Sequence, residues 1–391
     1  MSVWEPPAAV EQFPVPVAPR RRRRRWPAVL LVVVLALGGA AGAGALVISQ
    51  RDYTQAADHL NALVDEAQDS QTAQAAAVAS GTTAAHEADA LAALAGAGFT
   101  DAAAGTTLSA DARALDAAVA VAGTGLDVPA YAARHPQTWW PPAIRSATTQ
   151  LRDRADQLAA AVSQAQAATK AVTDATAKVA SSRDALLASV APVSAQVDAA
   201  NDMATNDSRF AFRDAAAAVD PTSGDQVAAL TTYVQAGQAL VASQAAEEAE
   251  LAGPLHARKV AVVEFARSID GGVLLDFTWA PTLSIDGQTW GRAGSLAGWT
   301  QFWFDRGGYA TISLTDSVAA EWPTSKSLVV HEVGHAIQTK CPDLADHSTR
   351  AAVEAWATAW AIGMGYTDPG NGTQAYGEPP ASLVEVSKSC R

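Results

Sequence analysis

The apolar positions of the chain follow three patterns, and each predicts a different kind of structure. From Trp26 to Gln50 there is no charge, and residues 27–49 could cross a hydrocarbon core of about 30 Å as a helix. Across residues 51–268, apolar residues recur at spacings of three and four, the period of an amphipathic helix. From residue 269, short apolar stretches alternate with glycine-containing turns. We therefore expect a mainly α chain: a single transmembrane helix, an Ala-rich helical stalk over 51–268, and a small α+β domain over 269–391.

The N-terminal segment suggests how such a span would be oriented. Residues 1–26 are rich in Pro and Ala and include six consecutive arginines, at 20–25. This composition predicts a disordered tail, and the arginines place it in the cytoplasm. The chain is then expected to be a single-pass cell-membrane protein whose remaining residues are extracytoplasmic. A cleaved signal peptide is the alternative, because Ala41-Gly42-Ala43 has the small-x-small form of a cleavage site.

The Ala-rich region predicts long helices. Segments 151–197 and 226–268 both have helical periodicity, and the turn residues at 220–224 lie between them. Two helices joined in this way should form an antiparallel coiled-coil hairpin, and Gly253-Pro254 should break the second. Further helices are expected over 53–95 and 108–122. The helical pattern carries no chemistry by itself, so we expect a spacer or an arm that binds an envelope protein partner.

The C-terminal region has a different composition. Seven of the 11 tryptophans lie between residues 279 and 360. Apolar stretches flanked by turn residues predict strands over 273–280, 299–304 and 309–314, with a hairpin turn over 305–308. Two helices should follow, over about 325–340 and 348–362. The formal net charge of the whole chain is −13 in spite of the N-terminal arginines, which argues against nucleic acid as a partner.

One motif in this region carries chemistry. His331 and His335 flank Glu332 in the sequence His-Glu-Val-Gly-His, within a segment expected to be helical. A spacing of four places both imidazoles on one helix face, one turn apart, where they can bind a single Zn²⁺. Glu332 would lie near the metal without ligating it, where it can take a proton from water as the catalytic base.

A catalytic zinc site needs a third protein ligand, and Glu354 is the first candidate. It lies on the next expected helix among Ala, Val and Trp, where a carboxylate is costly to bury unless a metal or a charge pairs with it. His347, just before that helix, is the rival ligand. Asp368 is a further candidate, in a turn that contains Gly and Pro.

The His-Glu-Val-Gly-His motif followed by a helix-borne glutamate resembles the gluzincin branch of the zincin metallopeptidases. The resemblance covers about residues 270–391 and implies that His331, His335 and Glu354 are zinc ligands and that Glu332 is the general base. It also implies that strand 309–314 is the edge strand to which an extended peptide substrate adds. The metzincin pattern does not fit, because its third histidine would fall at Cys341.

Two functions from different classes follow from these patterns. The first is a membrane-anchored zinc peptidase that cleaves peptide bonds outside the membrane. The second is a non-catalytic interaction protein whose zinc domain is degenerate or structural. Glu332 favours the enzyme, since a structural zinc site needs ligands but no base. In an exported domain, Cys341 and Cys390 should form a disulfide bond.

Overall fold

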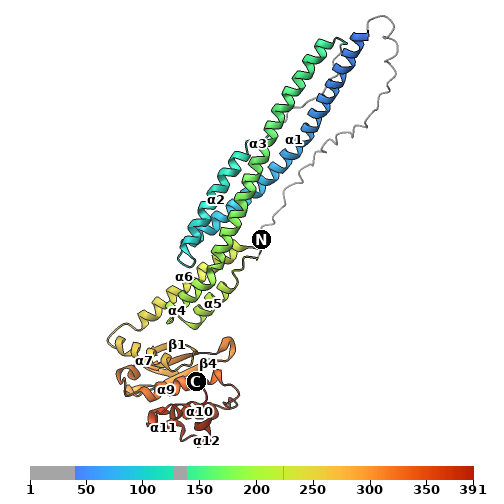
Figure 1. Cartoon of the computed structure of the whole chain (residues 1–391). Helices are drawn as coiled ribbons and strands as arrows, with labels where there is room; N and C mark the ends of the chain where they lie inside the picture. Colours follow the sequence, from blue (N-terminus) through green and yellow to red (C-terminus); the bar gives the residue numbers. More distant parts are fainter. Residues whose placement is uncertain (1–39, 127–138, 223) are drawn as a thin grey trace, which may run out of the picture. The chain divides into compact units, whose positions relative to one another are not determined.

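The computed structural model describes residues 40–126, 139–222 and 224–391, and most of them are helical (Figure 1). Within these described ranges, seven helices precede the first strand: α1 (Ala40–Ala95), α2 (Ala102–Ala122), α3 (Pro141–Ala188), α4 (Val190–Ala200), α5 (Asn206–Ala217), α6 (Gln226–Glu250) and α7 (His256–Ser268). The strands are β1 (Leu274–Ala280), β2 (Leu283–Ile285), β3 (Gln288–Trp290), β4 (Gly298–Trp303) and β5 (Tyr309–Thr315). The later helices are α8 (Asp316–Ala320), α9 (Lys326–Ile337), α10 (Arg350–Gly363), α11 (Thr373–Tyr376) and α12 (Ala381–Ser387).

The expected transmembrane helix over residues 27–49 is wrong. Among the described residues, no helix is both long enough and apolar enough to span a membrane. The described part of α1 starts at Ala40 and reaches the charged residues Arg51 and Asp52, and residues 27–39 of the expected span lie outside the described residues. The single-pass location in the cell membrane was inferred from that span, so this expectation is wrong as well. Residues 1–39, which include the expected tail and its arginines, lie outside the described residues.

The chain divides into two compact units, one of Met1–Asp69 with Leu126–Ser163 and one of Ser70–Gly125 with Gln164–Arg391. In the first unit, the opening part of α1 lies beside the opening part of α3. Each helix buries apolar side chains at helical spacing, namely Tyr53, Leu60 and Leu63 of α1 and Ile144, Leu151 and Leu158 of α3. The periodicity of the sequence therefore produces the expected amphipathic helices here.

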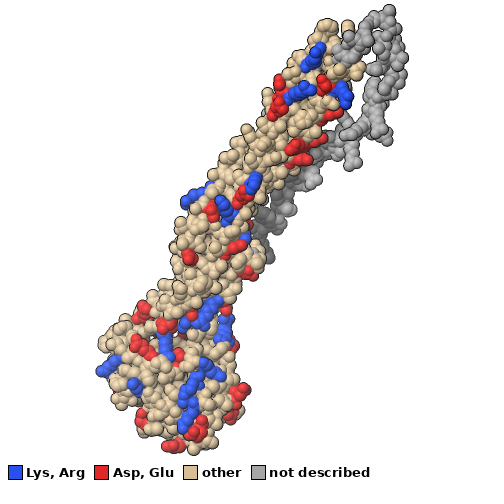
Figure 2. Space-filling model, in the orientation of Figure 1, with Lys and Arg blue, Asp and Glu red and all other residues tan. Residues whose placement is uncertain are grey.

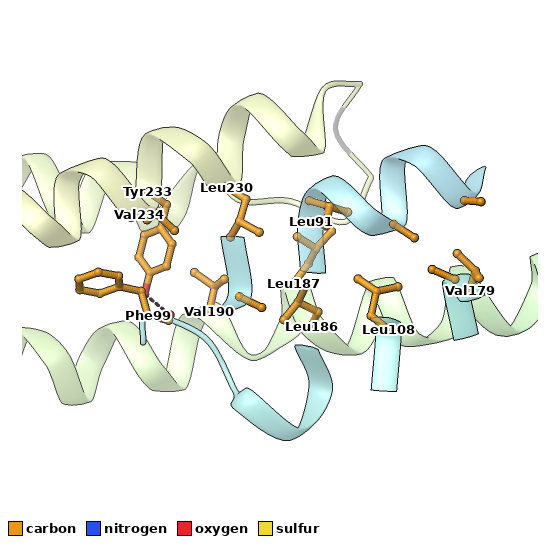
Figure 3. Close-up of a cluster of buried hydrophobic side chains, with 14 of the residues drawn as sticks. Leu91, Phe99, Leu108, Val179, Leu186, Leu187, Val190, Leu230, Tyr233 and Val234 are labelled. Atoms are coloured by element: carbon orange, nitrogen blue, oxygen red, sulfur yellow. Dashed lines mark hydrogen bonds between the residues drawn. The ribbon is translucent and has the colours of Figure 1, made fainter. Parts of the chain in front are cut away.

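In the second unit, several helices share one apolar core instead of forming a two-helix hairpin (Figure 3). The core takes Leu91 from α1, Leu108 from α2, Leu186 from α3 and Leu230 from α6, among others.

The segment expected as one helix over 151–197 breaks between α3 and α4, because Pro192 has no N–H to continue the helical hydrogen bonding. The segment 226–268 also breaks, at the expected Gly-Pro pair. The coiled-coil hairpin is thus replaced by a helix bundle. Figure 2 shows acidic and basic side chains interspersed on the face that it draws.

The C-terminal sheet has the strand order β1-β5-β4, with β1 parallel and β4 antiparallel to β5. The predicted hairpin between β4 and β5 is confirmed, and its turn uses Gly307 and Gly308 at positive φ. The expectation that 309–314 is an edge strand is wrong, because β5 is central and β4 is outermost. Strand β5 pairs along both of its edges, with β1 on one side and β4 on the other, and it buries Ala310, Ile312 and Leu314 on one face.

Helices α9 and α10 pack against each other and complete this region. They match the helices expected over 325–340 and 348–362 within about three residues. Gly334 allows their close approach, since a Cβ at that position would lie 2.9 Å from the Ala357 carbonyl oxygen. The expected disulfide between Cys341 and Cys390 is confirmed, and it ties the end of the chain to the segment after α9.

Candidate metal centre

Helix α9 places two imidazoles side by side in the interior. The His331 and His335 rings lie with their centroids 4.8 Å apart, and the two residues are only 4% and 6% exposed. Their spacing of one helical turn explains the proximity. Apolar neighbours on α9, including Val329, Val330 and Val333, anchor the helix in the core. The two rings are therefore held on a rigid element.

Helix α10 brings a carboxylate to the same point. The helix begins at the Thr349 cap, whose side chain accepts a hydrogen bond from the Ala352 N–H. Glu354 Oε2 then lies 3.3 Å from His331 Nε2 and 3.1 Å from His335 Nε2. Among the described residues, these three form the one group of at least three His, Cys, Asp and Glu side chains that could hold a metal ion.

The donor set fits a single metal ion. Two ligands bound at 2.0–2.1 Å with a tetrahedral angle between them lie about 3.3 Å apart, close to the two separations from Glu354. His331 Nδ1 lies 3.0 Å from the Asn371 carbonyl oxygen, so it can donate there and leave Nε2 free to ligate. His335 Nδ1 is buried and has no hydrogen-bond partner among the described residues.

The electrostatics of the cluster favour an ionised Glu354. Burial alone would raise the pKa of its carboxyl group, but hydrogen bonds and charge interactions with His331 and His335 hold that pKa well below its usual range. Arg350, one helical turn earlier, adds its Nε at 3.6 Å from Glu354 Oε1. The site thus contains a carboxylate that is negatively charged at neutral pH, as a ligand of a divalent cation should be.

Glu332 lies outside this group of three, although it is equally buried, at 5% exposure. Its Oε2 accepts a hydrogen bond of 2.7 Å from the Thr300 hydroxyl of β4. The expected base therefore contacts strand β4 and is not one of the three candidate metal ligands.

The rival ligands lie elsewhere. His347 packs its ring against Phe304, with centroids 4.8 Å apart, and both of its ring nitrogens are buried without a hydrogen-bond partner in the described part of the chain. Asp368 accepts hydrogen bonds from the Ser327 hydroxyl and from the Gly370 N–H. Neither belongs to the group that could hold a metal ion.

Tyr376 of α11, which follows α9 and α10 in the sequence, also contacts the cluster. Its ring stacks on His331 with the centroids 5.7 Å apart. Burial raises the pKa of its hydroxyl to about 12, with contributions from the negative charges of Glu354 and Glu332, so the hydroxyl stays protonated at neutral pH. Tyr366, the other tyrosine of this segment, packs against Phe265 instead.

A cavity of about 270 Å³ opens beside the cluster. One side is formed by β4, and the other by residues of α9 and α10 that include His335, Val353 and Glu354. The Arg350 guanidinium lies over the Trp299 ring, 5.2 Å from its centroid, and borders the same space. A substrate in this cavity would meet apolar side chains and one cation beside the candidate ligands.

Sequence reasoning missed three contributors to the site. Nothing in the local pattern marks Thr300 as a partner of Glu332, or Asn371 as a partner of His331, because each contact joins segments 32 or 40 residues apart. The sequence alone does not set Tyr376 apart from Tyr366, and its ring contact with His331 is what distinguishes it. Comparison of the chain with protein-family models, curated proteins and solved structures finds no match.

Proposed function

We propose that this chain is a zinc-dependent hydrolase that cleaves peptide bonds. Its metal ligands would be His331, His335 and Glu354, and its general base would be Glu332. The observation that carries the proposal is the convergence of three donor atoms on one point, with a separate buried carboxylate one residue along the same helix. The motif's resemblance to zincin metallopeptidases supports the same assignment.

The choice of zinc follows from the chemistry of the ligands. Two imidazoles and one carboxylate are a known ligand set of catalytic zinc, which needs three protein ligands and an open fourth position. Held by these three ligands, zinc would supply Lewis acidity, which polarises a substrate carbonyl and lowers the pKa of a bound water to about 7.

Glu332 would move the proton in this reaction. Its carboxylate accepts a proton from the attacking water and later delivers it to the departing amine. A buried carboxylate that makes no ion pair among the described residues is costly for folding, and catalysis gives a reason for its presence. A structural metal site would have no need of it.

Tyr376 and β4 would bind the substrate. The Tyr376 hydroxyl is a protonated donor next to the cluster, suited to the negative charge that develops on the carbonyl oxygen. Among the described residues, no strand pairs with the outer edge of β4, so an extended peptide can add to it as a further strand. The resemblance implied that an extended peptide adds to strand 309–314, which is β5. In this proposal the peptide adds to β4 instead.

The test uses the purified full chain. After loading with zinc, it should hold about one ion per molecule and cleave a fluorogenic peptide library. Glu332→Gln should keep the ion and lose cleavage by at least about 100-fold, because the base is removed and the ligands stay. Glu378→Gln, at an exposed glutamate, is the matched control and should change neither property. Equal cleavage by Glu332→Gln and by the unaltered chain would refute the assignment.

The non-catalytic alternative remains distinct from this proposal. It assigns the chain to binding a protein partner through its helices, with the metal centre serving the fold. That reading predicts zinc binding without cleavage, and identical behaviour of the Glu332→Gln variant and the unaltered chain. The same experiment therefore separates the two functions.

A further inference from the structure

One face of the edge strand β4 shapes the surroundings of the motif on α9. Residues at alternate positions of a strand point to the same side, and on β4 these are Gly298, Thr300 and Phe302. Thr300 contacts Glu332, and the Phe302 ring lies parallel to the His335 ring with the centroids 6.4 Å apart. All three positions of this face therefore meet α9 at or beside the motif.

The Thr300 hydroxyl carries one proton to donate, and two acceptor oxygens lie within reach of it. They are the Oε2 carboxylate oxygen and the main-chain carbonyl oxygen of Glu332, at 2.7 Å and 3.1 Å. The shorter contact is to the charged group, which makes the stronger hydrogen bond. No other residue in the described part of the chain donates to this carboxylate. Its second oxygen, Oε1, accepts no hydrogen bond from the described residues.

Gly298 provides the space that the carboxylate occupies. A Cβ at this position would lie 2.5 Å from Glu332 Oε1 and 2.7 Å from Cδ and Cγ, closer than side-chain atoms approach. The backbone of Gly298 does not have a positive φ, so its lack of a side chain matters here for space and not for conformation. One strand thus makes room for the carboxylate at Gly298 and supplies its hydrogen-bond donor at Thr300.

We propose that Thr300 is a positioning residue that holds the Glu332 carboxylate by one oxygen, beside the space that Gly298 leaves for the other, and so fixes the place from which Glu332 deprotonates water. The inference rests on the proposed function, because it gives Glu332 the role of base. Its consequence is that the strand to which the peptide adds is the strand that orients the base. Thr300 lines the cavity beside the cluster, and its side chain acts through its hydrogen bond to Glu332.

The experiment compares Thr300→Val and Thr300→Ser in the full chain loaded with zinc. Valine keeps the shape of threonine without the hydroxyl, whereas serine keeps the hydroxyl. Thr300→Val should lower kcat by about 10- to 100-fold with KM within about twofold, the size expected for losing a hydrogen bond to a charged group. Thr300→Ser should restore kcat to within about threefold. Zinc content should be the same in all forms, which separates positioning from loss of the site.

Thr278→Val is the matched control. Thr278 lies in the same sheet, and its hydroxyl donates to the Ser313 hydroxyl at 2.8 Å, away from the motif. The same chemical change there removes one hydroxyl hydrogen bond from the sheet. It should leave kcat and KM unchanged.

Crystal structures of the zinc-loaded chain and of Thr300→Val give a second readout that does not depend on cleavage. The carboxylate of Glu332 should occupy one position in the unaltered chain and leave it in the variant. An unmoved carboxylate, or an unchanged kcat in Thr300→Val, overturns the inference. If the unaltered chain with zinc cleaves no peptide, the proposed function fails, and the position of the carboxylate in the two structures still decides whether Thr300 holds it.

Discussion

Replacing Glu354 with Gln tests the metal centre through stability, without any knowledge of the substrate. Glu354 Oε2 is the atom that both imidazole nitrogens approach, at 3.1 Å and 3.3 Å. The substitution keeps the size of the side chain and removes its negative charge. A neutral amide oxygen binds zinc much more weakly than a carboxylate, so we expect the affinity for zinc to fall at least about 100-fold, the upper range for altering groups that merely support a ligand.

The size of the effect on stability follows from mass action. Free zinc at 100 times the dissociation constant of the unaltered chain stabilises the folded state by about 2.7 kcal/mol. A 100-fold weaker site under the same conditions contributes about 0.4 kcal/mol. For a unit of the size that holds the site, the difference of about 2.3 kcal/mol should appear as a loss of roughly 4 °C from the zinc-induced increase in Tm.

The assay is thermal unfolding followed by circular dichroism, with and without zinc at fixed free concentration. Glu378→Gln, an exposed glutamate changed in the same way, is the control and should retain the full increase in Tm. If Glu354→Gln shows the same zinc-induced increase as the unaltered chain, Glu354 is not a ligand and the assignment of the site is refuted.

Three further predictions concern the fold around the site. Replacing Cys341 and Cys390 together with Ser removes a cross-link between positions 49 residues apart, and should lower the free energy of unfolding by about 4 kcal/mol in urea titration; an unchanged urea midpoint would contradict this. Gly334→Val puts a side chain against the Ala357 backbone and should abolish zinc binding measured by elemental analysis; full zinc content in the folded variant would show that α9 and α10 can separate without harm. Burial raises the pKa of Asp276 to about 6, so the folded state binds this proton more tightly than the unfolded state. The resulting stabilisation is present below about pH 4 and is lost as the pH rises through 6, by up to about 3 kcal/mol, and Asp276→Asn should flatten this part of the pH–stability curve; equal slopes would argue against it.

Local patterns in the sequence predicted much of the fold for a physical reason. Helical periodicity and strand alternation fix which side chains share a face of an element, whatever its neighbours are. The ranges of α9 and α10, the β4–β5 turn at Gly307-Gly308 and the two histidines on one helix face all follow from such patterns. The β2–β3 hairpin was missed, although Asp286-Gly287 at positive φ is a recognised turn signal.

The errors arose where the outcome depended on distant parts of the chain. A hydropathy pattern favoured a span over 27–49, yet no helix among the described residues is long and apolar enough to cross a membrane. Two helical segments were expected to pair with each other, but several helices bury their apolar faces in one shared core. In each case the local pattern was compatible with more than one arrangement.

The sequence by itself determined the chemistry available: two imidazoles one helical turn apart, a carboxylate between them, and a second carboxylate on the following helix. Only the tertiary structure decided that Glu354 reaches both imidazoles, that β4 and not β5 is an edge strand of the sheet, and that Thr300 binds Glu332. The reason is that spacing along one element sets the direction of its side chains, whereas a contact between elements depends on which surfaces the whole chain buries together.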